Sequence, residues 1–290
     1  MKTSLSAESI AKITGRLRPT MSRVARLYPG ESGSRQPVHT VYGGAHLFKL
    51  DTATRLGQLA VRSFEKFAPD ASTFATVLDL PAKLADTVFT RVGEKLAHEA
   101  VEDLRIDFED GYGYRSDEEE DGNAVSTATD VAKGMTAGEL PPFFGIRIKS
   151  FSDETIRRSV TTLDLFLTTL VSQSRGILPE NFVVTLPKIV APEQVAALAD
   201  IFDEIEPRLG LDAGALKMEI MIETTQSIIG PDGIAAMPRL LHAARGRCVA
   251  AHFGAYDYTA SCGIAGPYQD MLHPACDFAR NMMLATFAGT

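Results

Sequence analysis

Three carboxylates alternate with apolar residues in the segment RIDFEDGYGYR, residues 105–115: those of Asp107, Glu109 and Asp110. Acidic side chains avoid the protein interior unless something compensates their charge. A helix N-terminus or a nearby arginine would do so, and so would a bound cation. This segment alone leaves both explanations open.

Two further carboxylates close apolar runs later in the chain. Glu223 ends MEIMIE, and Asp257 ends AAHFGAYD. At the same end of adjacent parallel strands the two side chains would converge, and like charges that close raise one another's pKa. A hard cation such as Mg²⁺ offsets the repulsion and uses one or two carboxylates plus waters and substrate. Either acid alone is more simply explained by an arginine partner or by solvent. Their matching positions favour a shared metal.

Two basic residues stand where an anionic ligand could reach them. Arg147 lies within FFGIRIKSF, and Lys188 lies in TLPKI. A guanidinium inside an apolar strand needs an anionic partner because it cannot lose its charge. For Arg147 one candidate partner is a substrate carboxylate or enolate oxygen. The other is a protein carboxylate, that of Asp107 or Glu109, in a salt bridge. One guanidinium can bind both. Lys188 has the same candidate role on weaker support.

Other signals are weaker. Gly254 and Ala255, just before Asp257, would let backbone N–H groups approach a ligand carboxylate. His46 and His252 fall near expected strand ends, where a lone histidine is more often structural. The acidic run in RSDEEEDGN, residues 115–123, is expected to be a solvated loop.

Strand and helix patterns alternate along the chain and would position these residues. Apolar stretches suited to strands cover residues 39–44, 103–110, 143–151, 181–189, 216–224 and 248–258. Each precedes a segment of helical periodicity, such as residues 51–68 after the first strand or 274–288 after the last. The strands read as continuous apolar runs, as in a parallel sheet covered on both faces.

Repeated strand–helix units allow a doubly wound sheet or a (β/α)8 barrel. In most units a polar or glycine signal follows the strand, and a barrel builds its site from the carboxyl ends of successive strands. The fold expected is therefore an α/β TIM-type barrel over residues 39–290, with six strand–helix units evident. Residues 1–38 form an N-terminal extension, with a short helix near residues 7–17, which packs on or caps the barrel.

Composition limits the classes of partner. The chain of 290 residues is 45% hydrophobic and 23% charged, with a formal net charge of −8, which argues against nucleic acid or an anionic membrane as the main partner. Three widely spaced cysteines, Cys248, Cys262 and Cys276, fit a reducing compartment and are interpreted as packing residues. With no signal-peptide pattern at the N-terminus, a cytoplasmic location is expected.

Five ordered motifs resemble the HpcH/HpaI aldolase and citrate lyase β-subunit superfamily, with some malate-synthase-like features. They are IDFEDG, GIRIK, TLPKI, MIET and FGAYDYT, all within residues 103–264. The resemblance implies a phosphoenolpyruvate/pyruvate-domain-like TIM barrel and a homotrimer or homohexamer. It implies Mg²⁺, or Mn²⁺, bound by Glu223 and Asp257, and Arg147 holding an enolate or carbonyl oxygen. By the same resemblance Asp107, Glu109 and Asp110 order metal-bound waters and Arg147.

The chain also departs from that pattern. HpcH-type pyruvate aldolases carry His where this sequence has Asp110, so their base is missing here. Two strands that follow in the superfamily, with an acid–base aspartate used by some relatives, have no counterpart after residue 290. The expected activity is a Mg²⁺-dependent carbon–carbon lyase on a 2-oxo or 3-hydroxy acid, including an acyl-CoA thioester. The alternatives are a malate-synthase-like condensation and a barrel that binds metal and ligand without turnover.

Overall fold

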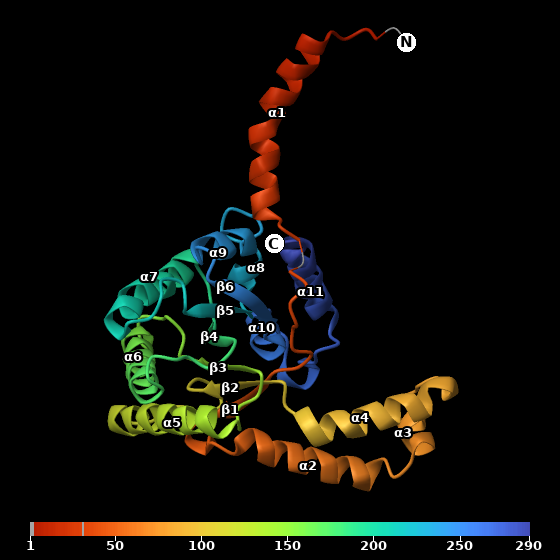
Figure 1. Ribbon diagram of the computed structural model, residues 1–290, viewed down its shortest axis with the longest axis vertical. Coiled ribbons are helices and arrows are strands. Elements are labelled where there is room, and N and C mark those ends of the chain that lie inside the picture. The colour runs from red at the N-terminus through yellow and green to blue at the C-terminus, as the bar shows by residue number, and fades with distance from the viewer. Residues whose placement is uncertain (1–2, 31) are drawn as a thin grey trace.

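The computed structural model describes residues 3–30 and 32–290, and its centre is one parallel β-sheet (Figure 1). Six strands lie in the order β1-β2-β3-β4-β5-β6, and every neighbouring pair is parallel. The sheet is not closed, because β1 and β6 are its two edges. The strands are β1 (Val41–Gly44), β2 (Asp103–Asp107), β3 (Phe143–Arg147), β4 (Phe182–Leu186), β5 (Lys217–Ile222) and β6 (Cys248–Phe253).

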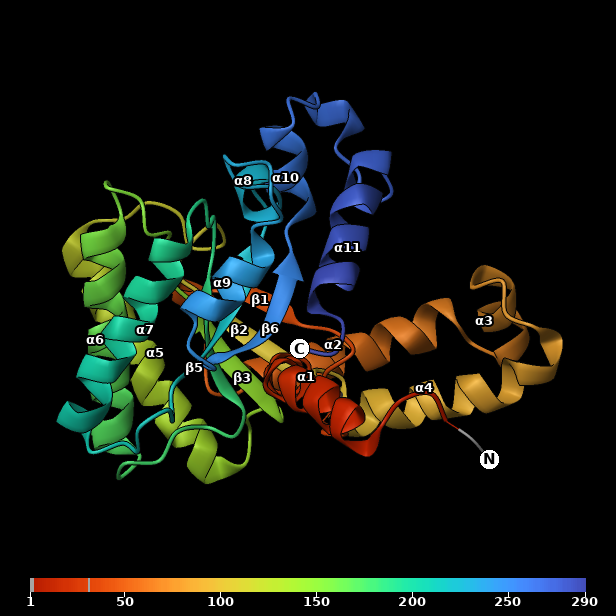
Figure 2. The ribbon, with the colours of Figure 1, turned by 90° about the horizontal axis from the view of Figure 1, so that it is seen from above.

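Helices connect the strands and cover the sheet. In both views α5, α6 and α7 lie together along one side, whereas α2, α3 and α4 project on the other (Figures 1 and 2). The helices between the strands are α2 (Thr52–Phe67), α3 (Ala71–Val77), α4 (Ala85–Glu99), α5 (Asp117–Ala137), α6 (Ile156–Gln173), α7 (Pro192–Leu209), α8 (Thr225–Ile228) and α9 (Met237–Ala243). After β6 come α10 (Ala255–Ser261) and α11 (Pro274–Phe287), and α1 (Ala7–Leu27) precedes β1.

The strands alternate between two faces, which corrects the expectation of continuous apolar runs. In β2 and just beyond it Leu104, Ile106 and Phe108 belong to the buried apolar core. The intervening residues point to the opposite face, where Arg105 and Asp107 make ion pairs with other strands. Successive side chains of a strand point to opposite faces, so the apolar face packs on helices while the other face carries charge. This alternation explains the charged residues within residues 105–110.

Polar side chains connect the strands across that charged face. The Glu219 carboxylate of β5 accepts hydrogen bonds from Arg105 Nη2 at 2.9 Å and from Thr185 Oγ1 at 2.7 Å. It also accepts from the hydroxyl of Tyr42 in β1 at 3.2 Å, and that hydroxyl lies 2.8 Å from His252 Nδ1 in β6. The two edge strands are thus linked through side chains although their backbones do not pair.

Helix α5 corrects the expectation of a loop at residues 115–123. It begins at Asp117, and its N-cap residue Ser116 accepts a hydrogen bond from the Glu119 N–H at 3.2 Å. Four acidic residues fill its first turn, where negative charge is favoured by the helix dipole. Ser116 followed three residues later by Glu119 was the available signal.

The N-terminal region also differs from expectation. Helix α1 runs to Leu27, no residue of it is buried, and it projects away from the sheet (Figure 1). It therefore does not cap the sheet, which is open and not the closed barrel expected from the sequence. The following segment does contact the sheet: the Val38 N–H donates to Glu102 Oε2 at 2.6 Å, and Thr40 Oγ1 donates to Asp103 Oδ2 at 2.8 Å.

The three cysteines differ in exposure. Cys276 is buried, Cys248 is half-buried and Cys262 is exposed, so packing does not explain Cys262. Among residues 3–30 and 32–290, no helix is both long and apolar enough to cross a membrane.

Candidate active site at the carboxyl ends of the strands

The residues singled out in the sequence lie at one end of the sheet. Asp107 is the last residue of β2, and Arg147 is the last residue of β3. The two residues are opposite each other in the strand register, so they lie side by side. Lys188 follows β4, and Glu223 follows β5 directly. Asp257 lies in the first turn of α10, not at a strand end as expected, because β6 stops at Phe253. Parallel strands place all these positions along one rim.

Asp107 is fully occupied by protein donors. Its Oδ1 accepts from Arg147 Nε at 2.8 Å and from the Glu109 N–H at 2.9 Å. Its Oδ2 accepts from Arg147 Nη2 and, at 2.7 Å, from the Gly111 N–H. This two-pronged pair is the salt bridge considered for Arg147 from sequence. Asp107 therefore fixes the orientation of the guanidinium.

The remaining edge of the Arg147 guanidinium is less committed. Nη1 lies 3.2 Å from Glu109 Oε2 and 3.7 Å from Met221 Sδ. The ring of Tyr42 supports the group from one face, with its centroid 4.9 Å from Cζ. The pKa of Arg147 is raised because its acidic neighbours outweigh the cost of burial. Sequence reasoning missed Tyr42, although its inward position in β1 follows from strand alternation.

The ammonium group of Lys188 contacts three of the carboxylates at this end of the sheet. Its ammonium lies 2.5 Å from Glu109 Oε1, 3.0 Å from both oxygens of Asp110 and 3.2 Å from Asp257 Oδ2. Burial lowers the pKa of Lys188 less than these carboxylates raise it. The pKa of Asp110 is lowered, since the Lys188 ammonium outweighs partial burial, whereas burial raises that of Glu109.

Glu223 is the most deeply buried acid of the candidate metal pair. It is 1% exposed, and its Oε1 accepts the backbone N–H of Lys188 at 2.7 Å. Burial raises its pKa to about 7, and the negative charges of Asp257 and Glu109 add to the effect. These charges act on Glu223 because the three acids lie near one another, as the sequence indicated.

Glycine at position 254 gives Glu223 its space. A Cβ there would lie closer than 3.0 Å to Glu223 Oε2, nearer than real Cβ contacts. The Gly254 N–H donates to the Ile222 carbonyl at 3.1 Å, so this N–H is already used. Gly254 therefore provides room for the Glu223 carboxylate. Ala255 is the first residue of α10, and the binding of a ligand carboxylate by its backbone N–H stays a prediction.

The side chains present fit a divalent cation such as Mg²⁺. The rim has five carboxylates, and in the part of the chain that the structure describes they pair with two cationic side chains, those of Arg147 and Lys188. The five belong to Asp107, Glu109, Asp110, Glu223 and Asp257. Glu109 Oε2 is buried and accepts no hydrogen bond within the described residues, although Arg147 Nη1 lies 3.2 Å from it. Within the described residues no three His, Cys, Asp or Glu side chains converge as a complete metal site. Mg²⁺ does not require one, since it keeps several waters and often uses one or two carboxylates.

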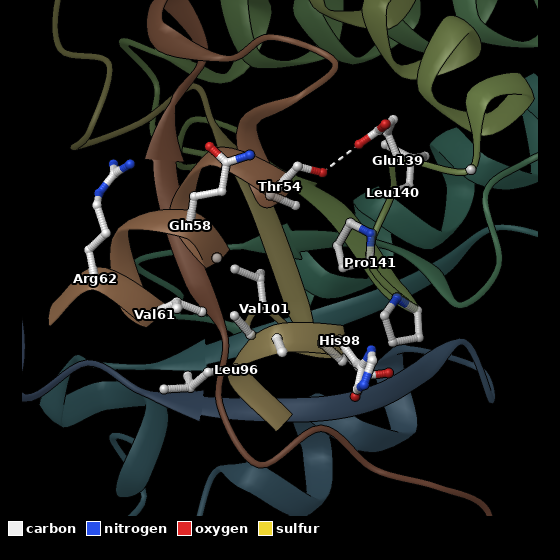
Figure 3. A pocket seen from close by; sticks show the side chains of 17 residues that line it. Thr54, Gln58, Val61, Arg62, Leu96, His98, Val101, Glu139, Leu140 and Pro141 are labelled. Carbon is white, nitrogen blue, oxygen red and sulfur yellow. Dashed lines mark hydrogen bonds between the residues drawn. The ribbon is translucent and has the colours of Figure 1, made fainter. Parts of the chain in front are cut away.

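Two cavities are lined by residues other than the rim acids and Lys188. One of about 770 Å³ is lined by the start of α2, the end of α4 and residues 138–142, where Thr54 donates to Glu139 (Figure 3). Another of about 1200 Å³ opens between β1 and β6 and includes Tyr42, Glu219 and His252. Neither is lined by Lys188, Glu223 or Asp257.

The chain matches one known protein family. A family described as "Domain of unknown function (DUF6986)" matches residues 17–290. The chain belongs to this family. No curated protein matches the DUF6986 chain.

Solved structures give distant matches. The lead(II) and magnesium/glyoxylate complexes of Haloferax volcanii malate synthase are each 18% identical over 63% of this chain, with a TM-score of 0.47. They are covered over 49% and 51% of their own lengths, so the chain spans about half of that enzyme. RipC from Yersinia pestis is 18% identical over 66% of both chains, with a TM-score of 0.40. Likeness at this level carries no argument about activity.

Proposed function

We propose that this DUF6986 protein is a Mg²⁺-dependent enzyme that cleaves or forms a carbon–carbon bond next to the carbonyl of a 2-oxo or 3-hydroxy acid. The observation that carries the proposal is the rim itself. Glu223 accepts the backbone N–H of Lys188, and Asp257 contacts the ammonium of the same residue. An arginine oriented by Asp107 pairs with Glu109, which also contacts that ammonium. The motif resemblance to HpcH/HpaI and citrate lyase β-subunit proteins, within residues 103–264, supports the same chemistry.

The protein residues have distinct tasks in this proposal. Glu223 and Asp257 would hold the cation through hard carboxylate oxygens. When bound, the cation supplies Lewis-acid stabilisation of negative charge on a substrate oxygen. Arg147 Nη1, the edge that Asp107 does not occupy, donates a hydrogen bond to that oxygen. A donor fixed before the reaction stabilises developing charge without reorganisation. Glu109 pairs with Arg147, and Glu109 and Asp110 pair with Lys188 before any ligand binds.

A lyase and a condensing enzyme share the enolate, so one experiment tests both. Incubation with pyruvate or acetyl-CoA in deuterated water, followed by proton NMR, measures exchange of the methyl protons. Wild-type protein with Mg²⁺ should accelerate exchange on at least one of the two compounds. Pyruvate exchange would favour the lyase, and acetyl-CoA exchange would favour the malate-synthase-like condensation.

Two variants make the test specific. Arg147→Met removes the donor, and Glu223→Gln removes a proposed cation ligand. Each should reduce exchange by about 100-fold, the range found when one electrostatic stabiliser is lost. Lys133→Met is the matched control, because Lys133 is 61% exposed and pairs with Asp130 on α5, far from the rim in the fold. Exchange that is equally fast in wild type and in Glu223→Gln would reject the proposed function.

A further inference from the structure

Among the described residues, Lys188 is the one cationic side chain that contacts acids from both sides of the rim. Glu109 and Asp110 come from the loop after β2, and Asp257 comes from α10 after β6. All three carboxylates lie within 3.2 Å of a single ammonium nitrogen. Lys188 therefore balances the charge that the proposed divalent cation would balance.

The backbone of Lys188 is fixed independently of its side chain. Its φ of 51° lies in the left-handed region, which a residue with a Cβ adopts only when its surroundings impose it. The N–H donates to Glu223 Oε1 at 2.7 Å, which ties the main chain to a proposed cation ligand. The side chain is 31% exposed, and a lysine stem with four carbons can reach other positions without moving the backbone.

A divalent cation and the ammonium would compete for the same oxygens. Asp257 Oδ2, a proposed cation ligand, is also the atom that Lys188 contacts at 3.2 Å. Two positive charges this close repel, and the carboxylates cannot serve both at full strength. Binding of the cation must therefore release the ammonium from Asp257.

We propose that Lys188 is an exchange residue, which occupies the carboxylates until a divalent cation binds and then pairs with an anionic group of the substrate. This inference rests on the proposed function and adds the order of binding, cation before acid. Lys188 Nζ and Arg147 Nη1 already meet at the two oxygens of Glu109, at 2.5 Å and 3.2 Å. A substrate carboxylate between these two donors would replace the contacts that Lys188 gives up, with bidentate geometry available at arginine.

Metal affinity tests the first half of the exchange without any assay of activity. Isothermal calorimetry with Mn²⁺ would be run on wild type, Lys188→Met, Lys188→Arg and Lys133→Met. Lys188→Met should bind Mn²⁺ about tenfold tighter or more, because the competing cation is gone. Lys188→Arg and Lys133→Met should stay within about threefold of wild type. Equal or weaker binding by Lys188→Met overturns the exchange while leaving the proposed metal site in place.

Mn²⁺ that binds none of the four proteins would instead reject the metal-dependent function, and the exchange with it. A lower stability of Lys188→Met would not change how its Mn²⁺ affinity is interpreted. That variant should also show the larger rise in melting temperature when Mn²⁺ is added, since ligand binding stabilises the folded state.

Oxalate, an unreactive dianion, tests the second half. At saturating Mn²⁺, Lys188→Met should bind oxalate about tenfold more weakly than wild type, and Lys133→Met should match wild type. Without Mn²⁺, wild type and Lys188→Met should bind oxalate equally poorly, because Lys188 is then held by the rim. Oxalate affinity in Lys188→Met that equals wild type at saturating Mn²⁺ overturns the role in substrate binding.

Discussion

At the scale of single residues, the molecule separates the rim carboxylates into two groups. Asp107 is saturated by donors from Arg147 and two backbone N–H groups. Glu223 instead accepts a single N–H and has a pKa raised to about 7 by burial. An acid with all its partners fixes geometry, and an acid kept short of partners is suited to bind a ligand.

The Asp107–Arg147 pair should be essential for stability as well as for orientation. Asp107→Ala leaves Arg147, which is 8% exposed, buried without its main partner. Breaking a buried pair in this way costs about 3–5 kcal/mol. Urea denaturation would measure the loss of unfolding free energy. Asp232→Ala, in a half-exposed pair with Arg239, is the matched control and should leave the free energy of unfolding close to that of the wild type. A cost below 1 kcal/mol for Asp107→Ala would contradict this account of the pair.

Glu223 should make stability depend on pH in the absence of divalent cations. With its folded-state pKa at about 7, the native protein keeps a proton that the unfolded chain releases near 4.5. The native state therefore binds more protons in this window, and stability falls as the pH rises through it. The fall should be about 3 kcal/mol, the equivalent of the pKa shift of Glu223, and should vanish in Glu223→Gln. Denaturation series across that window would detect it, and parallel curves for the two proteins would count against the shifted pKa.

At the scale of elements, the carboxyl ends of β2 to β5 and the start of α10 assemble the rim. The sequence predicted all six strands because each carries an apolar stretch followed by a helical pattern. It also predicted that Glu223 and Asp257 lie near one another. Strand alternation was misread, since the polar face of Arg105, Glu219 and His252 depends on side-chain contacts between strands that no single segment displays.

The turn from β6 into α10 should tolerate no side chain at position 254. Gly254→Ala would place a Cβ against Glu223 Oε2 and displace that carboxylate, so Mn²⁺ affinity should fall by about tenfold or more. Gly43→Ala is the control, because in the described part of the chain a Cβ at Gly43 meets nothing within 4 Å. Calorimetry on both variants measures the effect. Unchanged affinity in Gly254→Ala would show that Glu223 does not hold the cation from this position.

At the scale of the whole molecule, the sheet and its helices form a body from which two helical segments project (Figures 1 and 2). Helix α1 was expected to pack on the body, but its apolar side chains are exposed, and Ile13 and Leu17 are more than half exposed. Sequence periodicity shows that a helix is amphipathic, and it does not show which surface covers the apolar face. The trimer or hexamer expected from the motif resemblance stays a prediction.

Removal of α1 should leave the body intact. Because no residue of α1 is buried, a chain starting at residue 28 should unfold with a free energy within about 0.5 kcal/mol of the full chain. Thermal and urea denaturation would compare the two proteins at equal concentration. A marked loss of stability on truncation would mean that α1 packs against the body or a second copy in solution.

The central claim is that Glu223 and Asp257 bind one divalent cation together. The most direct measurement is an anomalous difference map from crystals of the protein soaked with Mn²⁺. The account predicts one strong peak with carboxylate oxygens of both residues at about 2.0–2.3 Å, the remaining positions filled by water or substrate, and the Lys188 ammonium moved off Asp257. A map in which Mn²⁺ binds elsewhere, or touches only one of the two carboxylates, would contradict it.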